Sequence, residues 1–104
     1  MQADPVNQVP IACSLDAGAL SARLKHFDDL RREALLDRRA IQDGLRVRLR
    51  AAPGVERRTR ELIAAEAQCC PFLSFDLCRH ERELVLDITG PAGARPIIDE
   101  FFAG

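Results

Sequence analysis

Apolar and polar residues alternate with a period of two in several short segments of the chain. Such alternation is typical of a strand that buries one face. It predicts strands over residues 9–15, 45–50, 72–80 and 84–89. In the second of these, Leu45, Val47 and Leu49 are the buried side and the intervening arginines are the solvated side. Asp43-Gly44 and Glu81-Arg82 are typical turn sequences.

Three other segments repeat their apolar residues every three or four positions, which is typical of amphipathic helices. Residues 17–39 are predicted to form a long helix, with a polar face that includes Arg23, Lys25, Asp28, Asp29, Arg32 and Glu33. A second helix is predicted over residues 55–70, because Pro71 cannot continue it. A short closing helix follows from Ala94 to Phe102.

The predicted order is β-α-β-α-β-β-α, which favours an α+β fold. We expect one layer of mostly antiparallel, four-stranded sheet covered by three helices. The length of 104 residues suits one domain with one core. We therefore predict a flexible N-terminus over residues 1–8 and a single α+β domain over residues 9–104.

Composition excludes several classes of function. Fifteen basic and sixteen acidic residues give a net charge of -1, so charge provides no argument for nucleic-acid binding. No apolar run approaches the ~18 residues of a membrane span, and no secretory signal is visible at the N-terminus. We expect a cytoplasmic protein without membrane contact, whose four cysteines are reduced.

The segment from residue 66 to residue 75, Glu-Ala-Gln-Cys-Cys-Pro-Phe-Leu-Ser-Phe, carries the candidate chemistry. Cys69 and Cys70 are adjacent at the predicted helix end, and Glu66 lies one turn before them. Consecutive helical positions point about 100° apart, so we expect one thiol inward and the other near the rim. Cys13 falls on the inward side of the first predicted strand. Cys78 lies on one side of the third predicted strand with Asp76 and His80, and we interpret it as an edge residue.

Thiolates select soft metal ions. Two or three thiolates without a Cys-x-x-Cys loop favour Hg(II) or Cu(I) over structural zinc, which needs four ligands. The predicted metal ligands are Cys69 and Cys70, with Cys13 as a third thiolate and Glu66 as a tuning group or weak fourth ligand. Hg(II) is the expected ion, Cu(I) and Zn are the alternatives, and no organic cofactor is expected.

The same motif supports a resemblance. Glu-x-x-Cys-Cys-Pro-Phe at residues 66–72, and Pro-Ile-Ala-Cys-Ser-Leu at residues 10–15, resemble a group of small bacterial proteins. Members of this group occur beside, or fused to, MerR-type metal-responsive regulators and mercury-resistance functions. The resemblance covers residues 10–103 and points to Cys13, Glu66, Cys69 and Cys70. It implies a heavy-metal association, with a metal-responsive regulator or a resistance protein as the partner.

Two other functions fit the sequence. One is a thiol redox or thiol-transfer enzyme with Cys70 as nucleophile and Cys69 or Cys13 as resolving thiol. The negative end of the preceding helix disfavours thiolates there, which argues against this enzyme. The other is an interaction module in which the cysteines only pack. Metal binding without catalysis is the leading hypothesis, and the sequence leaves the oligomeric state open.

Overall fold

Three of the four segments with predicted apolar alternation, residues 45–50, 72–80 and 84–89, contribute strands to a four-stranded sheet. The computed structural model describes residues 17–103, with side chains from residue 23 onward. The strands are β1 (Leu35–Ile41), β2 (Gly44–Arg50), β3 (Ser74–His80) and β4 (Glu83–Thr89). They lie in the order β1-β2-β4-β3, and each neighbouring pair is antiparallel.

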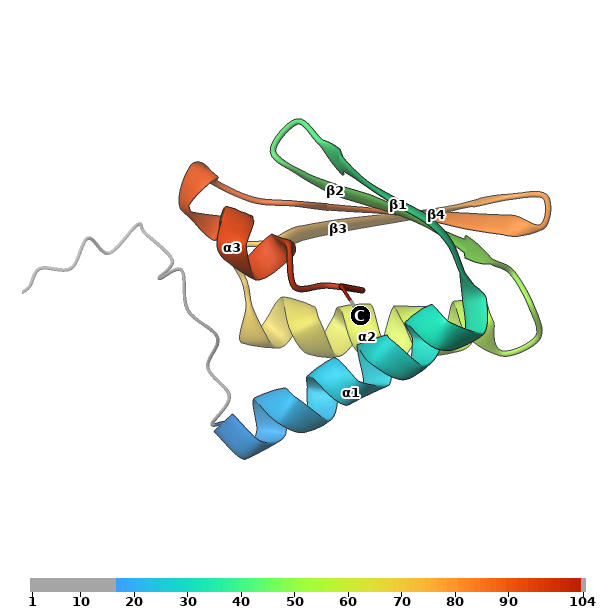
Figure 1. Cartoon of the computed structure of the whole chain (residues 1–104), viewed down its shortest axis with the longest axis horizontal. Coiled ribbons are helices and arrows are strands. Elements are labelled where there is room, and N and C mark those ends of the chain that lie inside the picture. Colours follow the sequence, from blue (N-terminus) through green and yellow to red (C-terminus); the bar gives the residue numbers. More distant parts are fainter. Residues whose placement is uncertain (1–16, 104) are drawn as a thin grey trace, which may run out of the picture.

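The helices cover one face of this sheet (Figure 1). Helices α1 (Ala17–Ala34) and α2 (Val55–Cys69) pack against each other in that layer. A short 3-10 turn, η1 (Ala92–Ala94), leads into α3 (Arg95–Ile98) near one end of the sheet. The α+β fold class predicted from the sequence is confirmed. None of the helices within residues 17–103 is long and apolar enough to cross a bilayer.

The core lies between the sheet and the helices. The inward side chains of β2 and β4 are almost completely buried: Leu45, Val47, Leu49, Leu84, Leu86 and Ile88. Phe27 and Leu30 of α1 meet them from the helical layer, together with the C-terminal Phe101 and Phe102. Phe27 contacts both of these rings edge to face, at centroid distances of 5.1 and 5.3 Å. Edge-to-face packing of buried rings fixes α1 against the C-terminal segment.

The outer face of the sheet is polar, as the alternating arginines predict. Arg46 of β2 pairs with Asp87 of β4 at 2.8 Å, and Arg48 pairs with Glu83 at 3.0 Å. These cross-strand pairs are partly solvated, so each contributes little to stability. They neutralise the charges of Arg46 and Arg48, whereas Arg50 of the same row donates to the main-chain oxygen of Glu33.

The long first helix predicted over residues 17–39 is wrong in its last five residues, 35–39. Helix α1 ends at Ala34, and Leu35–Ile41 is the edge strand β1. The sequence of β1 lacks the apolar alternation of a half-buried strand. Arg38 pairs with Val47 and faces the helical side, where an apolar residue would be expected. Arg38 instead donates to the main-chain oxygens of Phe101 and Asp99. These hydrogen bonds allow a polar side chain to occupy an inward position of the sheet. The strand therefore cannot be recognised from apolar residues in the sequence.

The first predicted strand, residues 9–15, lies outside the described residues, and β1 supplies the fourth strand of the sheet. Both predicted hairpin turns are present. Asp43 and Glu81 adopt left-handed φ angles of 64° and 55° in these two turns. Beside the first turn, Gly44 lies so close to β4 that a Cβ atom there would be 1.9 Å from the Ile88 carbonyl oxygen.

Candidate functional site

Arg23, Glu66, Cys69 and Cys70 form the candidate site, where the first half of α1 lies beside the last turn of α2 (Figure 1). Helix α2 ends here because Pro71 cannot donate a main-chain hydrogen bond. The Cys70 N–H still donates to the Glu66 carbonyl at 2.7 Å, closing the last turn. The cysteine pair is thus held at a fixed helix end, with Glu66 one turn behind it.

Glu66 is the carboxylate of this site and is buried, with 4% of the residue exposed. Arg23 of α1 donates from Nε to Glu66 Oε2 at 2.9 Å and from Nη2 to the Ala65 carbonyl at 2.8 Å. Burial raises the pKa of Glu66, while the Arg23 charge and a hydrogen bond from Cys70 oppose that rise. The arginine therefore compensates for a carboxylate that would otherwise be unpaired inside the protein.

Cys70 is a free, buried thiol. Its Sγ lies 3.7 Å from Glu66 Oε1, to which the thiol donates, and 3.9 Å from Cys69 Sγ. Burial, followed by the negative charge of Glu66, raises the pKa of Cys70 to about 11. At neutral pH this thiol is protonated, so it is a poor spontaneous nucleophile.

The expectation that all four cysteines are reduced is wrong for Cys69, whose sulfur is held in a disulfide bond, whereas Cys70 and Cys78 are free. Within the described structure the adjacent sulfurs thus differ in redox state. Cys69 can become a thiolate ligand only after that disulfide is reduced, because metal binding requires the thiolate.

The expectation that one thiol of the pair lies at the rim is wrong. Cys69 and Cys70 are 3% and 2% exposed. The 100° rotation between neighbours applies only inside a helix, and Cys70 has already left it, with φ -124° and ψ 71°. This change of backbone direction turns the second side chain inward beside the first.

Of the other predicted site residues, Cys13 lies outside the described residues. Cys78 is exposed on β3, opposite Val85, on the outer face of the sheet. The sheet itself separates Cys78 from the cysteine pair, which lies on the helical side. Asp76 and His80 are exposed on the same strand.

The part of the chain from residue 17 to 103 contains no group of three or more His, Cys, Asp or Glu side chains arranged to hold a metal ion. Glu66, Cys69 and Cys70 are neighbours, but they do not form a ready three-donor cage. A metal at the pair would need a further donor or a low coordination number.

Arg23 is the site residue that the sequence analysis missed, because it was placed on the solvated face of α1. Its side chain is only 13% exposed. The spacing of Arg23 from the apolar residues could have revealed its burial. Arg23, Phe27, Leu30 and Ala34 follow one another at four, three and four positions. This is the spacing of one helix face, and the last three residues are buried.

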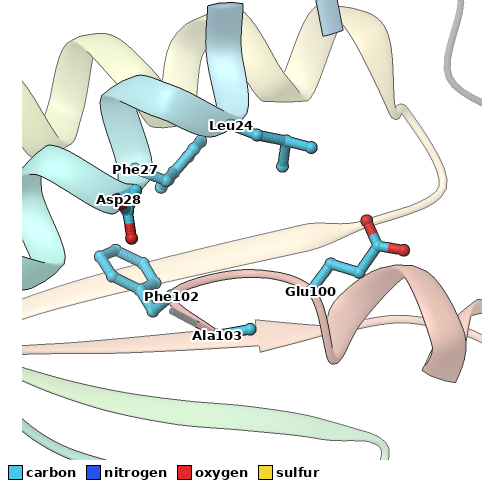
Figure 2. Close-up of a pocket in the computed structure, with 6 residues that line it drawn as sticks. All are labelled: Leu24, Phe27, Asp28, Glu100, Phe102 and Ala103. Carbon is cyan, nitrogen blue, oxygen red and sulfur yellow. The ribbon is translucent and has the colours of Figure 1, made fainter. Parts of the chain in front are cut away.

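A separate pocket of about 290 Å³ lies between α1 and the C-terminal segment (Figure 2). Its walls are Leu24, Phe27, Phe102 and Ala103, with Asp28 and Glu100 as the polar members. Asp28 is already engaged by Arg31 and Arg32 at 2.8 and 2.7 Å. Among the described residues that line this pocket there is no cysteine, and none of the described members of the thiol site.

The thiol site therefore combines two neighbouring sulfurs, a carboxylate in contact with one of them, and an arginine that fixes the carboxylate. Such a set can bind a soft cation or exchange a disulfide. In comparisons with known proteins, no family model, no curated protein and no solved structure matches this chain.

Proposed function

We propose that the reduced protein binds a soft heavy-metal ion, with Hg(II) as the principal candidate, and acts as a buffer, a sensor module or a carrier. The supporting observation is the 3.9 Å separation of Cys69 Sγ and Cys70 Sγ inside the protein. Cys69 and Cys70 are the primary ligands of this proposal. Cys13 is its third thiolate, and Glu66 is a charge beside the metal.

The sulfur separation favours a particular coordination. With metal–sulfur bonds of about 2.3 Å, two sulfurs of a trigonal site lie about 4.0 Å apart and those of a linear site about 4.6 Å apart. The observed 3.9 Å fits the trigonal value. A third donor is then required, which is the reason to keep Cys13 in the proposed ligand set.

Metal binding at this site depends on two chemical steps. A thiol reductant of the cell must first supply two electrons and two protons to open the disulfide of Cys69. The metal must then displace the proton of Cys70, whose pKa of about 11 keeps the thiol protonated in the absence of metal. Thiophilic ions achieve this because the strength of the metal–thiolate bond exceeds the cost of deprotonation.

A titration of the reduced protein with Hg(II), followed by the thiolate-to-metal charge-transfer band in the ultraviolet, tests the proposal. One ion per chain should be bound in competition with free cysteine. Cys69→Ser and Cys70→Ser should each weaken binding at least about a hundredfold, because each removes one thiolate.

Cys78→Ser is the matched control, since this cysteine is exposed on the other face of the sheet. It should leave the band and the affinity unchanged. Unchanged affinity in the Cys69→Ser and Cys70→Ser variants, or no charge-transfer band in the reduced wild type, would refute metal binding at the pair.

Thiol–disulfide exchange is the second candidate function, because a disulfide at Cys69 lies beside the free thiol of Cys70. The pKa of about 11 for Cys70 opposes it, since exchange catalysts need a thiol that ionises near neutral pH. Faster reduction of a small disulfide substrate by wild type than by Cys70→Ser would favour this function over metal binding.

The proposal extends to the protein's surroundings. The metal-binding form of the site needs a reduced Cys69, and we propose a cytoplasmic location because thiols are kept reduced there. A metal-responsive regulator or a resistance protein is the proposed partner, on the basis of the Glu-x-x-Cys-Cys-Pro-Phe motif that begins at Glu66. Co-purification of such a partner with the protein only after Hg(II) exposure would support this extension.

A further inference from the structure

The Glu66 carboxylate is oriented by its two neighbours. One oxygen, Oε2, accepts from Arg23 Nε at 2.9 Å, and the other, Oε1, faces Cys70 Sγ at 3.7 Å. The Glu66 oxygen that faces the sulfur is therefore not the oxygen that Arg23 binds. The negative end of the pair is thereby directed at the place where a thiolate-bound cation would lie.

We propose that Glu66, fixed by Arg23, makes the thiol site select divalent soft cations over monovalent ones. This inference rests on the proposed function and adds a selectivity to it. The energy of a cation beside a fixed negative charge is proportional to the charge of the cation. A divalent ion therefore gains twice as much from Glu66 as a monovalent ion, whatever the number of thiolates that bind both.

Burial makes this difference large enough to measure. The Arg23 and Glu66 side chains are 13% and 5% exposed, and the two cysteines are 3% and 2% exposed. Water screens charges weakly at such positions. Because Arg23 holds the carboxylate in one orientation, the field at the sulfurs is present before the ion arrives and needs no rearrangement.

The experiment compares Cd(II) and Cu(I) as the divalent and monovalent probes, on fully reduced protein. Cu(I) affinity is measured by competition with a chromogenic Cu(I) chelator, and Cd(II) affinity by competition with a fluorescent Cd(II) indicator. The variant Glu66→Gln removes the charge and keeps the shape. It should weaken Cu(I) by roughly tenfold and Cd(II) by roughly a hundredfold, so that the Cd(II)/Cu(I) affinity ratio falls about tenfold.

Two further variants make the test specific. Glu61→Gln removes a carboxylate of the same helix that is 63% exposed, and it should leave the ratio unchanged. Arg23→Gln removes the compensating positive charge and should shift the ratio in the opposite direction, toward Cd(II). This variant also serves as an independent test if Glu66→Gln does not fold, which thermal unfolding of each variant will reveal.

The outcomes separate this inference from the function on which it rests. If wild type binds neither probe, metal binding and selectivity are both wrong. If wild type binds both, and neither Glu66→Gln nor Arg23→Gln changes the ratio, metal binding stands and the selectivity inference is overturned. Opposite shifts in the two variants support it.

Discussion

Arg23 and Glu66 form an ion pair 2.9 Å long between two helices, and both side chains are largely removed from water. The pair joins the first half of α1 to the last turn of α2. Its arginine also donates to the main-chain oxygen of Ala65, so the guanidinium satisfies two acceptors at once. A buried charge without its partner is expensive, and this pair therefore makes the geometry of the thiol site depend on the packing of the two helices.

The first prediction concerns the stability that depends on this pair. Glu66→Ala should lower the free energy of unfolding by about 3 kcal/mol, because it leaves the guanidinium of Arg23 buried and unpaired. Urea denaturation measures the change. Glu61→Ala, at an exposed position of the same helix, should change stability by no more than about 0.5 kcal/mol.

The double replacement Arg23→Met/Glu66→Leu distinguishes a lost partner from lost packing. It should recover most of the stability, since two apolar side chains of similar size incur no cost of burying charge. A double variant that is less stable than Glu66→Ala would mean that the ion pair itself contributes net stability.

Much of the fold can be predicted from periodicity, because β2 and β4 each bury a clean apolar face and β3 packs the half-buried Phe75 and Leu77 against the core. Helix α2 is predictable too, although its buried residues include the polar Thr59 and Glu66. The exception is Leu35–Ile41, whose inward Arg38 bonds to the carbonyls of Phe101 and Asp99. Those acceptors are more than sixty residues away in the chain. No local pattern can reveal that an arginine faces the core when its partners come from the other end of the sequence.

The sequence predicts that Glu66, Cys69 and Cys70 belong to the candidate site. It does not predict the burial of these residues or the ion pair with Arg23. The contact of Glu66 with Cys70 follows from their spacing of four in the sequence. The burial of both cysteines depends on the backbone leaving the helix at Cys70, and the burial of Arg23 depends on how α1 packs on α2. Both are properties of tertiary packing, which a helical wheel does not contain.

The second prediction concerns the reactivity of the free thiols. Cys78 is exposed and should react rapidly with an aromatic disulfide reagent at pH 8. Cys70 should react at least about a hundredfold more slowly, because burial and a pKa of about 11 leave little accessible thiolate. Stopped-flow kinetics on Cys78→Ser and Cys70→Ser separate the two thiols. Equal rates in the two variants would contradict the burial of Cys70.

The third prediction is a loss of stability at alkaline pH. The folded pKa of Cys70 is about 11, above its ordinary value of 9.0, so folding favours the protonated thiol. Its contribution to stability is fully present below pH 9 and is lost as the pH rises toward 11. Urea denaturation across this range should therefore give a falling free energy of unfolding.

Cys70→Ser provides the control for this pH dependence, since serine does not titrate there. The decline between pH 9 and 11 should become much shallower in this variant, while Cys78→Ser should retain it. A decline of the same size in Cys70→Ser would assign the effect to other groups.

The fourth prediction concerns the redox state of Cys69. Treatment of the unfolded protein with a phosphine reductant should increase the number of titratable thiols per chain, because the Cys69 disulfide is then opened. In Cys69→Ser the reductant should have no effect. Hg(II) binding should likewise require the reductant in wild type, since only reduced Cys69 provides a thiolate. Strong binding by the unreduced protein would remove Cys69 from the ligand set.

The fifth prediction tests the contact that fixes the β1–β2 hairpin on β4. Gly44→Ala would bring a Cβ atom to 1.9 Å from the Ile88 carbonyl oxygen, and main chain on both sides must move to relieve this overlap. We expect a loss of about 3 kcal/mol or more, measured by urea denaturation.

Gly54→Ala is the matched control. Gly54 has φ +82° but open space around it, so only backbone strain opposes its replacement. That strain costs about 1–2 kcal/mol, and Gly44→Ala should therefore be the more damaging change. The reverse order would mean that β2 and β4 are farther apart at Gly44 than the structure has them.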